Sequence, residues 1–126
     1  MCSSDLAEAE SAYLKLRQIA PGELLPAARL AEIYMRAGKR KEAREQLESL
    51  QRESPTHPLP SYYMGVLSLD EHQLERAAEQ FERSLLLAPE FEPAYAELAT
   101  TQLSLGRSKE ALATLEKRGK IGRAHV

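Results

Sequence analysis

The feature that most constrains this chain is an internal repeat of 34 residues. Four columns of residues share that spacing. Their members are Pro21, Pro55 and Pro89; Ala9, Ala43, Ala77 and Ala111; Tyr13, Leu47, Phe81 and Leu115; and Leu30, Met64 and Leu98, which are followed by the small residues Ala31, Gly65 and Ala99. A repeat of this length corresponds to one supersecondary unit, which cannot bury its apolar face alone. The sequence therefore predicts an array of stacked units.

The composition indicates that each unit is a pair of α-helices. Ala, Leu, Glu and Arg, all strong helix formers, are the commonest residues, and Trp is absent. The column prolines can end the second helix of each unit, because proline lacks an N–H and disfavours a helical conformation in the preceding residue. Gly38 and Gly106 are placed to adopt the left-handed conformation that ends the first helix of a repeat. In the repeat between them, His72 holds the same position. The small and large columns predict close helix contacts.

These columns resemble the tetratricopeptide repeat family. The resemblance implies an all-α fold, a right-handed α-solenoid of helix-turn-helix hairpins with about seven helices. In phase with the family, repeats cover residues 24–57, 58–91 and 92–119, and residues 7–23 supply the second helix of a truncated repeat. The aromatic residue often found late in the first helix is present only as Tyr34; Ser68 and Gln102 replace it. Pentatricopeptide proteins, which bind RNA, are the nearest alternative, but the period of 34, the alanine and proline columns and the slight acidity count against them.

The two ends of the chain fit no column. Residues 1–6 back-translate to GTG-TGC-TCT-TCC-GAT-CT and residues 120–126 to AAG-ATC-GGA-AGA-GCA-CAC-GTC, both of which resemble a sequencing-library adapter. We hypothesise that both segments are adapter-derived scars on a fragment of a longer, bacterial protein, whose natural sequence is about residues 7–119. Other codons at these positions in the encoding DNA would refute this origin.

Several classes of function find no support in the sequence. The 17 basic and 19 acidic residues are spread along the chain, without the basic face that nucleic-acid binding requires. No apolar run approaches the roughly 18 residues of a membrane span. His57 and His72 lack a second metal ligand one helical turn away, and no hydroxyl has a histidine base at a persuasive position. We expect no metal, no cofactor and no catalysis, and a soluble chain of the cytoplasm or periplasm.

The resemblance implies that first helices line a concave face, and helical spacing predicts which residues reach it. The predicted partner-binding residues are Arg29, Glu32, Met35, Tyr62, Tyr63, Val66, Leu69, Thr100 and Leu103. In this hypothesis Met35, Tyr62, Val66 and Leu69 hold an apolar peptide or partner helix, and Arg29 and Glu32 fix its register. The alternative is that these side chains pack onto a neighbouring repeat or a following domain.

One subtype of the family clamps the C-terminal carboxylate of chaperone tails with Lys and Asn on this face. The corresponding positions here carry neither type; they hold Ala28, Glu32, Tyr62, Val66, Ala96 and Thr100. The resemblance thus implies a non-catalytic scaffold or adaptor of another subtype. The second hypothesis is a regulatory or substrate-docking arm of a larger enzyme, such as a glycosyltransferase or sulfotransferase.

Overall fold

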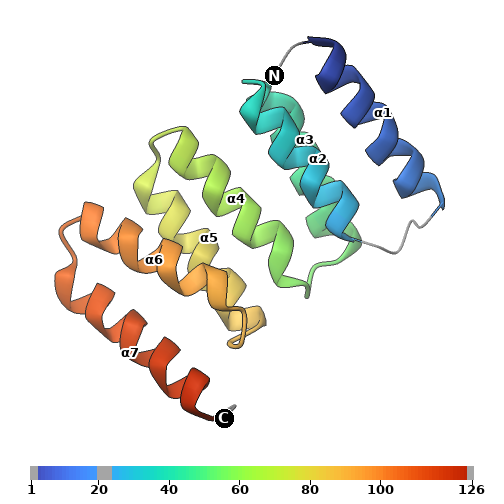
Figure 1. Cartoon of the computed structure of the whole chain (residues 1–126). Coiled ribbons are helices and arrows are strands. Elements are labelled where there is room, and N and C mark those ends of the chain that lie inside the picture. Colours follow the sequence, from blue (N-terminus) through green and yellow to red (C-terminus); the bar gives the residue numbers. More distant parts are fainter. Residues whose placement is uncertain (1–2, 20–23, 125–126) are drawn as a thin grey trace. The chain divides into compact units, whose positions relative to one another are not determined.

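The structure is a computed structural model that describes residues 3–19 and 24–124, with side chains over 7–19 and 24–121. The described residues form seven α-helices and no strand (Figure 1). The helices are α1 (Ser3–Ile19), α2 (Leu24–Arg36), α3 (Arg40–Glu53), α4 (Pro58–Asp70), α5 (Leu74–Leu87), α6 (Glu92–Ser104) and α7 (Ser108–Ala124). None of these described helices has the length and apolar character needed to cross a membrane.

The chain divides into two compact units. Unit 1, Met1–Pro55, contains α1, α2 and α3, and unit 2, Thr56–Val126, contains α4 to α7. In unit 1, α2 packs against both α1 and α3; in unit 2, each helix packs against the next one along the chain. Helices adjacent in the sequence run in opposite directions within each unit (Figure 1). The predicted helical hairpins are therefore present in both units.

The core of unit 2 is built around Phe81, whose side chain is fully buried. Ala77, Ala78 and Leu98 form a buried cluster with it. Gly65 of α4 lies directly against the aromatic ring: a Cβ at this position would stand 2.6 Å from Phe81 Cε1. The missing Cβ is what lets α4 approach α5 closely. The predicted contact between small and large columns is confirmed at this pair.

Unit 1 has a smaller core and a polar link between α1 and α2. Leu30, Ala43 and Leu47 are buried, as the columns predict. The Tyr34 hydroxyl donates a 2.9 Å hydrogen bond to Glu10 Oε1 and so joins α2 to α1. Burial, followed by this hydrogen bond and the charges of Glu10 and Glu42, raises the pKa of Tyr34 to about 12. The phenol therefore remains protonated over the physiological pH range and keeps donating.

The three turns between paired helices share one backbone geometry. Gly38 and Gly106 each have φ of 78°, which confirms the left-handed conformation predicted for them. His72 adopts the same conformation, with φ of 59°. In each turn the residue after the left-handed one donates its backbone N–H to the carbonyl five positions earlier, as Gln73 N does to Ser68 O at 2.8 Å. This is a Schellman motif, in which a residue with a Cβ is strained at the left-handed position.

We expect His72→Gly to raise the free energy of unfolding by about 1 kcal/mol, because glycine adopts positive φ without the steric cost that a Cβ incurs. His72 is exposed, so little packing is lost. Urea denaturation followed by circular dichroism measures the change. The reverse substitution, Gly106→His, should destabilise by a similar amount; equal stability of both variants and the parent would reject the strain.

Two positions differ from the sequence expectations. Leu115 does not fill a gap between hairpins: it is 41% exposed, whereas Leu47 and Phe81 of the same column are 0% exposed. The reason is that α6 packs on α5, but no described helix follows α7 to cover the corresponding face. Ala28, expected on the concave face, is fully buried. Helices α1 and α7 also extend into residues 1–6 and 120–126, and the origin of those segments stays a prediction.

Candidate functional site

The nine predicted partner-binding residues fall on three first helices. Arg29, Glu32 and Met35 lie on α2 of unit 1; Tyr62, Tyr63, Val66 and Leu69 lie on α4, and Thr100 and Leu103 on α6, both in unit 2.

The α4 residues form a half-buried apolar stripe. Tyr62, Val66 and Leu69 occupy positions i, i+4 and i+7 of one helix, which places them on the same face. All three pack against the cluster around Phe81 and keep part of their surface exposed. They therefore serve as core and as surface at once. Both predictions for these side chains, binding of a partner and packing onto a neighbouring repeat or a following domain, concern their exposed surface.

The stripe has an aromatic end. The Tyr62 ring lies 5.3 Å from the Tyr63 ring and 5.3 Å from the Phe91 ring, both in edge-to-face arrangements, and 5.8 Å from the Phe81 ring. Such pairs hold each other in place and add about 0.5–1.5 kcal/mol per pair beyond area burial. The repeat columns could not have found Phe91, because the equivalent residues of the earlier repeats are Glu23 and His57.

The α6 residues add a neutral, exposed edge. Thr100 is exposed, and Leu103 is 56% exposed. The Thr100 hydroxyl donates to Ala96 O at 2.9 Å, within its own helix. Its polar hydrogen is therefore already used, and the side chain offers mostly its methyl group to solvent.

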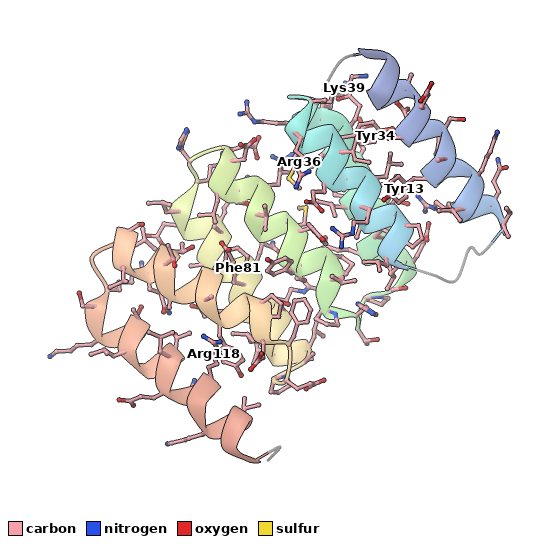
Figure 2. The ribbon with its side chains drawn as sticks, viewed as in Figure 1. Tyr13, Tyr34, Arg36, Lys39, Phe81 and Arg118 are labelled. Carbon is pink, nitrogen blue, oxygen red and sulfur yellow. The ribbon has the colours of Figure 1, made fainter. Side chains whose placement is uncertain are left out.

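The α2 residues of unit 1 are mostly charged. Glu32 accepts from Arg29 Nη1 at 3.2 Å and from Arg36 Nη2 at 2.9 Å, which holds its carboxylate between two guanidinium groups. Met35 is half-buried beside them. Exposed pairs of this kind stabilise the fold by only about 0–1 kcal/mol each. The arrangement leaves one net positive charge and a fixed carboxylate on the surface. Figure 2 shows Arg36 and Tyr34 on this part of the chain.

The titratable groups that the structure describes were compared with the arrangements that metal binding and nucleophilic catalysis need. The described residues contain no group of three His, Cys, Asp or Glu side chains placed to hold a metal ion. His57 serves as the N-cap of α4, where its Nδ1 accepts from Leu59 N at 3.2 Å. Burial, with a smaller contribution from Glu90, raises the pKa of Tyr95, whose hydroxyl donates to Pro89 O at 2.6 Å. This shift favours the neutral phenol, the opposite of what a nucleophile needs.

Comparison with solved structures finds the same fold. MamA from Desulfovibrio magneticus RS-1 (residues 41 to the end) superposes with a TM-score of 0.75 at 20% identity, over 96% of this chain and 68% of MamA. A second MamA crystal structure gives 0.73 at 24% identity, over 94% and 69%. The second TPR of Spaghetti (RPAP3), solved bound to the HSP90 peptide SRMEEVD, gives 0.68 at 19% identity, over 75% and 88%. A search of curated protein sequences finds no significant match.

Comparison with protein families identifies the repeat itself. The sequence profile described as tetratricopeptide repeat matches residues 3–62 and 68–124, nearly the whole chain. The seven helices and their pairing agree with the fold that the 34-residue columns predict. The chain belongs to the tetratricopeptide repeat family.

Proposed function

We propose that this chain is a non-catalytic protein-interaction module whose first helices contact a peptide segment or a helix of a partner protein. The observation that carries the proposal is the α4 stripe: Tyr62, Val66 and Leu69 are held by the core on one side and exposed on the other. Side chains fixed in this way lose little entropy on binding, so more of their contact energy is retained as affinity. The peptide seated on the related fold of RPAP3 supports the same type of role.

The partner is expected to be apolar where it meets unit 2. The stripe and the other predicted partner-binding residues of unit 2, Tyr63, Thr100 and Leu103, carry no formal charge. Tyrosine is enriched among interface residues that dominate binding energy. In unit 1, the Arg29–Glu32–Arg36 group is expected to set the register of the partner. A partner with one acidic and one basic group could pair with an arginine and with Glu32 in one alignment only.

The central test is the double substitution Tyr62→Ala, Val66→Ala. A binding peptide would first be selected from a displayed peptide library with the intact chain, and its Kd measured by calorimetry. We expect the double variant to bind about 30-fold more weakly, because two contact residues of the hot-spot type contribute about 2 kcal/mol or more. Undiminished affinity at unchanged helicity would reject the α4 stripe as the binding surface.

A second variant separates binding from folding. Tyr62 and Val66 also pack on the core, so their loss lowers stability as well. Thr100→Glu, Leu103→Glu changes only exposed side chains among the predicted partner-binding residues of unit 2, and it is expected to place two carboxylates beside the apolar partner. This variant should bind weakly while unfolding like the parent. Leu112→Ala, which alters a 61% exposed leucine of α7 outside the surface, is the matched control and should bind normally.

We expect the acidic peptide SRMEEVD, bound by RPAP3, to bind this chain with a Kd weaker than about 1 mM. No lysine or asparagine stands at the positions that clamp a carboxylate in that subtype, and Glu32 places a negative charge there. Fluorescence anisotropy with a labelled peptide measures the affinity. Micromolar binding would show that this chain recognises acidic peptides through residues other than those clamp positions.

A further inference from the structure

Unit 2 contains a cavity of about 570 Å³ that involves none of the nine predicted partner-binding residues. Its lining comes from α5, α6, α7 and the turn before α6. The most buried lining residues are Tyr95, Leu98 and Gln102 of α6, with Thr114 of α7. Leu86 of α5 also lines the cavity and is 84% exposed. The cavity is thus an apolar recess between α5 and α7 with α6 at its base.

The two hydroxyl groups at the base are already engaged. The Thr114 hydroxyl donates to Gln102 Oε1 at 2.8 Å, and the Tyr95 hydroxyl donates to Pro89 O at 2.6 Å. Neither hydroxyl hydrogen is left to direct a polar ligand. The remaining apolar lining residues are Leu85, Leu86, Pro89, Leu98 and Ile121. The base therefore favours a ligand whose inner part is hydrocarbon.

The rim carries more positive than negative charge. Lys117 and Lys120 lie one helical turn apart on α7, and Glu82 on α5 is the one acidic group in the lining. Neither lysine forms an ion pair with any residue that the structure describes. Two ammonium groups above an apolar recess are complementary to one carboxylate at the end of an apolar chain. Lys120 lies in residues 120–126, the segment predicted to be adapter-derived. The test therefore substitutes only residues that precede this segment.

The dimensions argue against a docked helix. One turn of α-helix, 5.4 Å long and 10–12 Å across, fills about 420–610 Å³, so the cavity holds about one turn. A helix in a groove is recognised through residues at i, i+4 and i+7, which span two turns. An extended peptide would press backbone N–H and C=O groups against a base whose hydroxyls are already used, at a cost in free energy. An alkyl chain carries no such groups.

We infer that this cavity binds a free fatty acid, with its alkyl chain against Leu85, Leu86 and Leu98 and its carboxylate beside Lys117 and Lys120. The site is independent of the proposed partner-binding surface. It would give the module a small-molecule ligand in addition to a protein partner.

The probe is sodium decanoate below its micelle concentration, titrated into the full chain by calorimetry, with decylammonium as a ligand of equal chain length and opposite charge. We expect saturable 1:1 binding of decanoate and at least tenfold weaker binding of decylammonium. Leu86→Glu should weaken decanoate binding about tenfold or more, because it removes apolar contact and adds a like charge. Lys117→Ala should weaken it about two- to fivefold, the effect of an exposed ion pair.

Matched variants keep the test specific. Leu112→Glu and Arg118→Ala change an exposed leucine and a basic residue of α7 that do not line the cavity, and both should bind decanoate like the parent. All four sites are exposed, so folding should be retained and circular dichroism would verify it. Absence of saturable binding, equal binding of both probes, or equal losses in the Leu86 and Leu112 variants would overturn the inference. Displacement of decanoate by peptides that bind the α4 stripe would overturn its independence.

Discussion

Phe81→Ala should lower the free energy of unfolding by about 3–5 kcal/mol, the cost of deleting a buried aromatic ring from a core that collapses only partly. Phe81 is fully buried, contacts the Ala77, Ala78 and Leu98 cluster, and lies against Gly65 and the Tyr62 ring. Figure 2 places it between the ribbons of unit 2. Domains are stable by about 5–15 kcal/mol, so this one substitution would remove a large part of the total. Urea denaturation followed at 222 nm measures it.

The control for this prediction is Leu86→Ala on the same helix. Leu86 is a large apolar residue five positions from Phe81, but it is 84% exposed. Its truncation should change stability by no more than about 0.5 kcal/mol. A loss below about 1 kcal/mol for Phe81→Ala, or equal losses for the two variants, would mean that Phe81 is not the centre of the core.

Gly65→Ala sets two effects against each other. Alanine favours a helix interior over glycine by about 1 kcal/mol. The new Cβ would stand 2.6–2.8 Å from three ring atoms of Phe81, and this ring is enclosed and cannot move aside freely. Overpacking of this kind costs about 1–3 kcal/mol, and three short contacts put it near the upper end. We expect a net loss of about 1–2 kcal/mol, measured by the same denaturation.

Two further variants identify the cause. Gly119→Ala, in α7, has nothing within 4 Å of the added Cβ and should be neutral or stabilising by up to about 1 kcal/mol. Gly65→Ala combined with Phe81→Leu should cost less than the sum of the two single losses, because the smaller residue relieves the clash. Stabilisation by Gly65→Ala, or strict additivity in the double variant, would contradict close contact between these two residues.

The repeat columns predicted the fold because each column has one physical role that recurs. Ala43, Ala77 and Ala111 are buried where helices approach, and Gly38 and Gly106 have positive φ where first helices end. Features that occur in one repeat alone could not be predicted from the columns. Leu115 shares the column of Phe81, but no helix that the structure describes covers it, so its exposure could not be predicted from the period.

The candidate surface was predicted less completely than the fold. Helical spacing placed Tyr62, Val66 and Leu69 on one face of α4, and the structure agrees that they share it. Spacing could not show that the same side chains also pack on the core, because that depends on how far α5 lies from α4. Nor could it find Phe91, which lies outside any helix and enters the aromatic cluster through the turn between α5 and α6.

The central claim is that stacked helical hairpins meet through small residues set against large ones, and the Gly65–Phe81 pair tests it most directly. A nuclear Overhauser measurement on the full chain should show strong cross-peaks between the Gly65 Hα protons and the Phe81 ring protons. Those Hα signals should also be shifted by the ring current. Absence of both signals in a helical, folded sample would contradict this packing and, with it, the surface that α4 presents to a partner.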